Sequence, residues 1–255
     1  MREKILRALK ELESKEQCRF LFAAESGSRA WGFASPDSDY DVRAVYVEPE
    51  SWYWDIAEKK RDTIEARMPG DLDISAWELR KTLRLFGACN PSLNEWLGSP
   101  VIYFADGAFF ETLKGLLPGF FNPVRAGHHY LALAENAWKT LSADNAITLK
   151  KLFYAQRGLF CAMWSARFRT MPPTKFDDLL IPELLPDGIL RLIRRLKVRK
   201  EQACEKESVA LPGELYDFYT VQRASVLRDL AAVKFTPPGN TALNDLFRRC
   251  VTSRP

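Results

Sequence analysis

Residues 19–47 read RFLFAAESGSRAWGFASPDSDYDVRAVYV, and this stretch decides the fold of the first half of the chain. Its first six residues, 19–24, form an apolar run that is typical of a buried strand. Residues 25–39 are rich in Gly, Ser, Pro and Asp, which predicts a loop holding one helical turn. Residues 40–47 are β-branched and aromatic with alternating polarity, the strongest strand signal in the chain. The predicted order is therefore strand, loop, strand.

Outward from this stretch, the N-terminal half mixes helices with strands. An amphipathic helix is expected at 3–16, further strands at 62–67, 71–76 and 101–104, and helices at 77–88 and 92–98. Beyond residue 106 the spacing of apolar residues predicts almost only helices, at 123–142, 145–168, 187–206, 213–234 and 240–250. The sequence thus predicts an α+β fold with a small mixed sheet in residues 1–110, followed by an all-helical domain in residues 111–255.

Charge is unevenly divided between these halves. The chain carries a net charge of +4, but residues 1–105 hold 15 basic and 18 acidic side chains, a net of −3, while residues 106–255 hold 22 and 15, a net of +7. An acidic half beside a basic half suits a metal site next to a surface that binds a polyanion such as RNA. The basic run RLIRRLKVRK at 191–200 is the candidate for that surface. Ordinary charge for solubility remains the alternative.

Several classes of protein are not expected. No apolar run reaches about 18 residues, so no membrane-spanning helix is predicted. The charged N-terminal stretch MREKILRALKELESKEQ lacks the apolar core of a signal peptide, so we expect a cytoplasmic protein that does not bind a membrane. The five cysteines are widely spaced without a CxxC motif, which predicts reduced, mostly packed thiols and no structural zinc. His128 and His129 are adjacent on a predicted helix and point in different directions, so they are not expected to share a metal.

Acidic residues cluster at the start of the strongest predicted strand. Asp39 and Asp41 are two residues apart, so both side chains should project to one side of the strand, where a divalent cation would relieve their repulsion. Asp73 lies on a later predicted strand and reaches the same place if the two strands pair. Asp71 has the same strand parity, and we prefer Asp73 because it lies deeper in its strand. Arg43 shares the face of the aspartates and is a candidate ion-pair partner for them.

A glycine and a serine precede this acidic pair. Gly27 and Ser28 follow a buried strand, where a glycine lets backbone N–H groups approach a phosphate and a serine hydroxyl adds a donor. A Gly-Ser dipeptide or a DxD pattern alone is usually no more than a turn. The ordered combination of strand, Gly-Ser, DxD on a strand and a further acid on a later strand is much more specific.

GSRAWGFASPDSDYDVR, residues 27–43, resembles the signature of DNA polymerase β-type nucleotidyltransferases. Together with LDISAWELRKTLRL, NPSLNEWLGSPVIY and KKLFYAQRGL, it extends the resemblance over about residues 20–185. These longer strings are similar to one branch of the superfamily, the predicted nucleotidyltransferases associated with RNA ligase and RNA repair operons.

The resemblance implies a polymerase β-like sheet domain followed by a helical domain that binds substrate and nucleotide. It implies that Gly27 and Ser28 bind the triphosphate of an NTP. It also implies that Asp39 and Asp41 bind two Mg²⁺ or Mn²⁺ ions, and that Asp73 completes the catalytic metal site and assists the acceptor hydroxyl.

Three further residues are candidates for nucleotide binding. Superfamily members often use a basic residue from the first helices of the helical domain to hold the triphosphate, and Lys151 and Tyr154 lie at helical spacing in LKKLFYAQRG. The tyrosine ring could stack on the base, although a solvated face with one amphipathic tyrosine explains the pattern as well. Arg29 follows Ser28 directly and is a candidate contact for the γ-phosphate.

The resulting hypothesis is a Mg²⁺-dependent nucleotidyltransferase that moves a nucleoside monophosphate from an NTP, ATP in the first instance, onto an RNA end during RNA repair. One alternative is transfer of AMP onto a protein or small molecule. Another is a non-catalytic, nucleotide-binding partner of an RNA ligase or other repair protein.

Overall fold

The computed structural model describes residues 1–56, 61–68, 70–204 and 206–253. Its contacts divide the chain into two compact units. The first unit holds residues 1–30, 39–120 and the segment from 237 onward, and the second holds residues 31–38 and 121–236. The chain therefore passes between the units four times, and no single boundary separates them.

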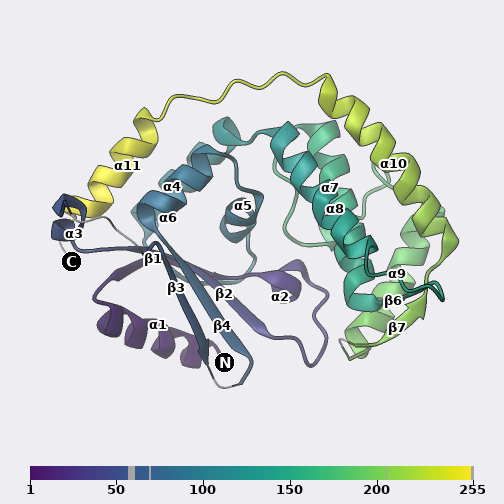
Figure 1. The fold of residues 1–255 in the computed structure, drawn as a ribbon, viewed down its shortest axis with the longest axis horizontal. Coiled ribbons are helices and arrows are strands. Elements are labelled where there is room, and N and C mark those ends of the chain that lie inside the picture. Colours follow the sequence, from purple (N-terminus) through teal and green to yellow (C-terminus); the bar gives the residue numbers. More distant parts are fainter. Residues whose placement is uncertain (57–60, 69, 205, 254–255) are drawn as a thin grey trace. The chain divides into compact units, whose positions relative to one another are not determined.

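The first unit is built on a five-stranded mixed sheet with the order β3-β4-β2-β1-β5 (Figure 1). The strands are β1 Arg19–Glu25, β2 Tyr40–Val47, β3 Thr63–Met68, β4 Leu72–Glu78 and β5 Ile102–Ala105. β2 and β4 run parallel, whereas all other neighbours are antiparallel. This arrangement confirms the expected α+β fold with a small mixed sheet.

One face of the sheet is covered by helix α1, Arg2–Glu16. Ile5, Leu9 and Leu12 recur at helical spacing and are buried, and they share a core with strand residues such as Val42 and Ile74. Burial of such side chains stabilises the unit by roughly 1.5–3 kcal/mol each before the loss of chain entropy is counted.

The other face is only partly apolar. Helices α4 Leu79–Gly87, α5 Pro91–Leu97, α6 Gly107–Phe120 and α11 Thr241–Thr252 share a second core with β1 and β2. Val45 belongs to that core, and because side chains alternate along a strand, Asp41 and Arg43 lie on the same face as Val45. The helices therefore pack on the apolar part of this face, and its other part carries the charged residues. The short helix α3, Glu50–Trp54, follows β2.

The second unit is helical apart from a two-stranded sheet. Its helices are α7 Pro123–Trp138, α8 Leu149–Phe168, the short η1 Asp177–Leu179, α9 Asp187–Gln202 and α10 Gly213–Ala231. β6 Ala146–Thr148 pairs antiparallel with β7 Ser208–Ala210. Helices α7 and α8 approach closely at Gly158, where a Cβ atom would lie only 2.8 Å from the carbonyl oxygen of Tyr130.

Residues 31–38 belong to this second unit although they connect α2 to β2 of the first. Phe33 is fully buried, with its ring centroid 5.3 Å from that of Phe153 and 5.4 Å from that of Phe176. The backbone N–H of Phe176 donates to the carbonyl of Trp31 at 2.8 Å. The aromatic packing anchors this connection in the helical unit.

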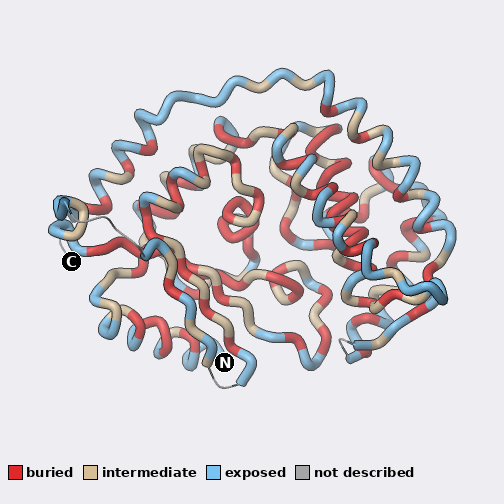
Figure 2. Tube along the Cα trace, viewed as in Figure 1, coloured by how far each residue is buried: buried red, intermediate tan, exposed pale blue. Residues whose placement is uncertain are grey.

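Several features differ from the sequence predictions. Helix α6 and the short helix α3 were not predicted, and the composition of α6, GAFFETLKGLLPGF, with two internal glycines and a proline, hides its helical period. The second half is not all-helical, since it contains β6 and β7. These strands were not predicted because three residues are too few to show a period. Its second helix begins at residue 149 rather than 145, since the Thr148 side chain accepts a hydrogen bond from the backbone N–H of Lys151 and caps it. In place of one boundary between residues 110 and 111, residues 31–38 belong to the second unit and the segment from 237 onward belongs to the first. That segment contains α11, along which buried positions alternate with exposed ones (Figure 2).

None of the described helices combines the length and the apolar composition that a membrane-spanning segment needs. All five cysteines are free thiols. Cys89, Cys161 and Cys250 are buried, Cys18 is half-buried, and Cys204 is exposed. Burial raises the pKa of Cys18 to about 12, with Glu48 nearby adding to the effect, and burial raises the pKa of Cys250 to about 11.

We predict that Cys204 reacts with iodoacetamide much faster than the other four cysteines, because the thiolate is the reactive form and burial suppresses it in Cys18 and Cys250. Labelling of native protein at mildly alkaline pH, followed by peptide mass spectrometry, measures this. A Cys204→Ser variant should lack the fast phase, and equal labelling of Cys18 and Cys204 in native protein would contradict the assignment.

Candidate active site

The parallel pairing of β2 with β4 brings two acidic residues together. Asp41 and Asp73 are direct partners in the register of the two strands. Neighbouring strands lie about 4.7–4.9 Å apart, and residues in register present their side chains to the same face. Two residues separated by more than thirty positions in sequence are therefore adjacent on the charged part of the sheet.

Arg43 bridges this pair. Its Nη2 lies 2.9 Å from Asp41 Oδ1 and its Nη1 lies 2.9 Å from Asp73 Oδ2. The expectation that Arg43 is an ion-pair partner of the aspartates is confirmed for Asp41 and for Asp73 but not for Asp39. The Asp41 and Asp73 side chains are each 31% exposed and that of Arg43 is 20% exposed, so water and a ligand can reach all three.

Gly27 permits this placement of Asp41. It is the first residue of the short helix α2, Gly27–Trp31, and has a φ of +62°. A Cβ atom on residue 27 would overlap Asp41 Oδ2. From the sequence we assigned this glycine to phosphate binding alone. The structure adds a second requirement, because only glycine leaves room for the Asp41 carboxylate. Ser28 follows and is buried, and its contact with a phosphate stays a prediction.

Glu25 is a residue that the sequence analysis did not single out. Its side chain is 2% exposed, and Oε1 accepts a hydrogen bond of 2.9 Å from the backbone N–H of Asp41. Oε2 accepts a hydrogen bond from the Tyr103 hydroxyl. Burial raises the pKa of Glu25, while the hydrogen bonds from Tyr103 and the Asp41 amide oppose that shift. The only sequence feature that points to Glu25 is its position as a single carboxylate at the end of an apolar predicted strand.

The backbone on either side strengthens this link. The N–H of Ser26 donates to the carbonyl of Asp41 at 2.8 Å, and the hydroxyl of Ser99 donates to the carbonyl of Glu25 at 2.7 Å. Glu25 thus binds the N–H of Asp41, Ser26 binds its carbonyl, and Gly27 leaves room for its carboxylate.

Asp39 and Arg29 lie beside this cluster in the chain but make different contacts. Asp39 precedes β2 and is exposed, and its carboxylate has no hydrogen bond or ion pair with a described residue. Arg29 Nε donates to the backbone carbonyl of Asp39 at 3.0 Å, and the guanidinium lies 3.8 Å from the centroid of the Tyr40 ring. Arg29 is therefore held against the start of β2.

Asp71 is separated from Asp73 by its position in the ladder. It precedes β4 with a φ of +56°, and its carbonyl accepts the N–H of Tyr40. Asp73, not Asp71, is the acid that pairs in register with Asp41.

The remaining nucleotide-binding candidates belong to the second unit. Lys151 is exposed in the first turn of α8. Tyr154 is half-buried, with its ring edge against Trp31 at a centroid distance of 5.0 Å. Their contact with a nucleotide stays a prediction.

The basic run 191–200 lies on α9 and is partly used within its own unit. Lys197 pairs with Asp177 and Glu201 at 2.9 Å each, and Lys200 is buried and hydrogen-bonded to Ser35. Arg199 also pairs with Glu207 at 2.6 Å. These three residues are used within the unit, which leaves Arg191, Arg194 and Arg195 as the candidates for RNA.

Over the part of the chain that the structure describes, no group of three or more His, Cys, Asp or Glu side chains is placed to hold a metal ion. The structure brings Asp41 and Asp73 together and leaves Asp39 outside that pair. The donor set nevertheless fits Mg²⁺ or Mn²⁺, because two partly exposed carboxylates in register supply the hard oxygen ligands that these ions prefer, and they already share one cation in Arg43.

Comparison with known proteins shows which proteins the chain is similar to. The sequence model described as "RNA repair pathway DNA polymerase beta family" (RlaP) matches residues 1–249. The uncharacterized protein YcgL of Bacillus subtilis (strain 168) is 36% identical over 235 residues, which cover 92% of this chain and 90% of that protein. A crystal structure of a nucleotidyltransferase-like protein from Exiguobacterium sibiricum 255-15 aligns with 95% of this chain and 74% of its own at 12% identity. Its TM-score is 0.31, too low to carry an argument.

We predict that Gly27→Ala destabilises the protein more than Gly32→Ala. Both glycines have a positive φ, so both substitutions introduce strain of about 1–2 kcal/mol. Only at residue 27 does the new Cβ also meet another atom, Asp41 Oδ2, whereas nothing lies within 4 Å of a Cβ on residue 32. Urea unfolding of both variants measures the difference.

The same comparison in an Asp41→Ala background isolates the clash, because the carboxylate is then absent. We expect the excess cost of Gly27→Ala to disappear there. An excess that persists in this background would show that the clash with Asp41 is not its cause.

We predict that Glu25→Ala lowers the free energy of unfolding by about 2–3 kcal/mol, because the N–H of Asp41 and the hydroxyl of Tyr103 lose their buried acceptor. Glu25→Gln keeps a carbonyl oxygen for the Asp41 N–H and should cost less. The control is Glu65→Ala on β3, which removes an exposed hydrogen bond from Ser75 and should change stability by no more than about 0.5 kcal/mol. Equal losses for Glu25→Ala and Glu65→Ala in urea unfolding would refute the role of Glu25.

Proposed function

The chain belongs to the RNA repair pathway DNA polymerase beta family, and from this premise we propose that it is a metal-dependent nucleotidyltransferase that moves a nucleoside monophosphate from an NTP onto an RNA end. ATP is the nucleotide we expect first. The observation that carries the proposal is the pair Asp41 and Asp73, in register on parallel strands and joined by Arg43.

In nucleotidyl transfer the acceptor oxygen forms a bond to the α-phosphorus, the bond between the α- and β-phosphates breaks, and pyrophosphate leaves. The reaction needs the triphosphate charge neutralised and the acceptor hydroxyl aligned with the α-phosphate. Asp41 and Asp73 are the ligands we propose for Mg²⁺ or Mn²⁺, with Asp39 as a further ligand from the residue preceding β2. The bound ion supplies positive charge at the phosphate oxygens. Asp73 is the carboxylate we assign to the acceptor hydroxyl, whose proton it can accept.

Arg43 keeps the two carboxylates in place when they are not engaged by a ligand. Its two terminal nitrogens donate to one oxygen of each carboxylate, Asp41 Oδ1 and Asp73 Oδ2. The guanidinium also remains close to any anion that approaches the pair.

Gly27 and Ser28 are the residues we propose for the triphosphate. We propose that backbone N–H groups at residues 27 and 28 donate to a phosphate, and because Gly27 lies against Asp41, a phosphate held there is close to the carboxylates. Arg29 is directed to the start of β2 by Asp39 and Tyr40, and we propose that it contacts the γ-phosphate. Lys151 and Tyr154 are proposed contacts for the triphosphate and the base from the helical unit.

The acceptor is proposed from the family and from charge. Residues 106–255 carry a net charge of +7, which favours a polyanion such as RNA over a neutral small molecule. An RNA ligase or another repair protein is the proposed partner, since the family name places these proteins in an RNA repair pathway. AMP transfer onto a protein or small molecule uses the same residues and differs only in the acceptor.

Transfer of label from α-³²P-labelled NTPs tests the proposal. Each NTP is incubated with Mg²⁺ or Mn²⁺, the protein and a pool of cleaved RNAs with varied ends. We expect labelled RNA from the unaltered protein, and a loss of about 10²–10³-fold or more in Asp41→Asn and in Asp73→Asn.

Asp71→Asn is the matched control, because it removes a carboxylate two residues from Asp73 at a left-handed backbone position that asparagine tolerates well. It should retain activity. Label on a protein or small molecule instead of RNA would replace the RNA end by another acceptor. Bound NTP with no transfer to any acceptor would favour the non-catalytic reading, and an active Asp41→Asn variant would remove the proposed site.

A further inference from the structure

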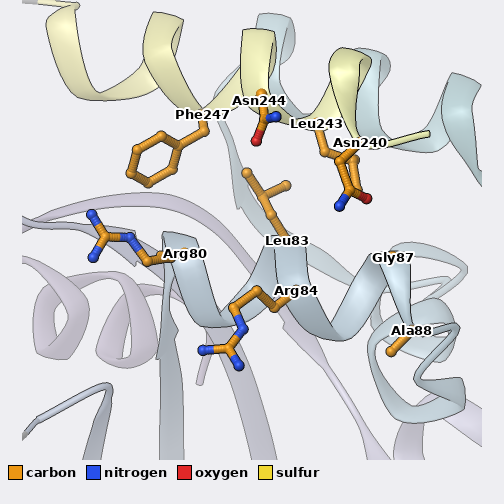
Figure 3. Close-up of a pocket in the computed structure, with 9 residues that line it drawn as sticks. All are labelled: Arg80, Leu83, Arg84, Gly87, Ala88, Asn240, Leu243, Asn244 and Phe247. Atoms are coloured by element: carbon orange, nitrogen blue, oxygen red, sulfur yellow. The ribbon is translucent and has the colours of Figure 1, made fainter.

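A groove lies between helices α4 and α11 of the first unit, outside the cluster of carboxylates. Its volume is about 500 Å³. Its lining includes Arg80, Leu83 and Arg84 from α4 and Asn244 and Phe247 from α11 (Figure 3). The volume falls in the range of about 300–1,000 Å³ that is usual for ligand sites.

Arg80 is held by aromatic rings. The carbon at the centre of its guanidinium lies 5.3 Å from the ring centroid of Tyr53 and 5.3 Å from that of Phe247. Tyr53 is fixed in turn, because its hydroxyl donates to Glu78 Oε1 at 2.5 Å and its ring meets Phe247 edge-on at 5.2 Å. Contact with rings positions a guanidinium without using its N–H groups, which remain able to bind an anion.

Arg84 lies one helical turn further along α4 and is exposed. Among the described residues, neither Arg80 nor Arg84 has a carboxylate partner. Like charges four residues apart on a helix destabilise it by about 0.2–0.5 kcal/mol. The Cβ atoms of such a pair are about 6 Å apart, a spacing that successive phosphates of a flexible strand can match. A bound polyanion would relieve this repulsion.

The facing helix adds neutral polar groups. Asn240 and Asn244 are exposed and again four residues apart, and both line the α11 side of the groove, whereas the Arg84 side chain extends from α4 away from α11 (Figure 3). Their amides can donate to phosphate or sugar oxygens and accept from bases. Leu83 and Leu243 make the wall between the helices apolar. Cations, amides and aromatic rings are among the groups with which proteins hold a single strand.

We propose that this groove binds the sugar–phosphate backbone of a single-stranded polynucleotide, with Arg80 and Arg84 on two phosphates. The groove is separate from the proposed catalytic site, because Arg80 follows the end of β4 that is opposite Asp73, about 15–20 Å away by the rise of the strand. It would hold a strand whose end is processed elsewhere, and its affinity for that strand does not depend on metal or NTP.

Fluorescence anisotropy of a short, fluorescein-labelled, unstructured RNA tests the proposal with the full chain in EDTA, so that no catalysis is required. We expect Arg80→Gln/Arg84→Gln to weaken binding about tenfold or more at low salt. The slope of log K against log salt should become less steep by about 1.4, since each phosphate contact of a single strand contributes about 0.7.

Arg7→Gln/Lys10→Gln is the matched control, because it removes two exposed positive charges from α1 on the other face of the sheet. It should leave the affinity within twofold of that of the unaltered protein and the salt slope unchanged. Arg84→Gln alone leaves the aromatic contacts of Arg80 intact and should lower the slope by about 0.7.

Three results would overturn the proposal. The first is an unchanged affinity and slope in Arg80→Gln/Arg84→Gln. The second is an equal loss in the α1 control, which would indicate a general effect of charge. The third is displacement of the RNA by AMP or inorganic phosphate at concentrations equal to the RNA's own, which would make the groove a site for a small anion. If label transfer fails while RNA binding is intact, the proposed function is rejected and the assignment of the groove to RNA is unaffected.

Discussion

Because residue 27 is a glycine and has no Cβ atom, the Gly-Ser segment can lie directly against the carboxylate of Asp41. Gly27 lies against the carboxylate of Asp41, and any larger residue would displace that carboxylate. Glu25 and Ser26 bind the N–H and the carbonyl of the same aspartate, so three consecutive residues determine where Asp41 lies. The register between β2 and β4 then determines where Asp73 lies, and Arg43 joins the two.

The net charge of this cluster explains how it can be tolerated by the fold and still attract a divalent cation. Asp41 and Asp73 with Arg43 sum to one negative charge, and Asp39 beside them adds another. Because all three bridged side chains are 20–31% exposed, solvent screens the ion pairs, and their contribution to folding is modest. An excess of negative charge in a screened but partly enclosed site is what a divalent cation can neutralise at little cost to the fold. Glu25 differs from these residues, because it is buried and its role is to hold backbone rather than to meet a ligand.

The local parts of this arrangement could be predicted from the sequence, whereas the long-range parts could not. The strand at residues 40–47 was predicted with its observed limits, because alternation and β-branching act locally. Arg43 was identified as a partner of the aspartates from strand parity alone. The acceptor role of Glu25 depends on Tyr103, which is 78 residues away, and the setting of Arg80 depends on Phe247. Neither pairing leaves a periodic trace in the sequence. The strands β6 and β7 were not predicted because each has only three residues, too few to show a period.

The two exchanged segments explain why the chain cannot be divided at one point into two independent domains. A fragment ending near residue 110 would retain Phe33 but lose Phe153 and Phe176, and would expose a ring that is fully buried in the whole chain. It would also lose α11, whose Leu243 and Leu246 belong to the core over α4. The complementary fragment would lack Phe33 at the centre of its aromatic cluster. The chain passes between the units at residues 30–31, next to Arg29, and at residues 38–39, where Asp39 begins the return to the first unit. Both residues therefore border the segment that folds with the helical unit. The carboxylate pair, with Gly27 and Arg43, lies within the first unit, and only the connection between α2 and β2 folds with the second.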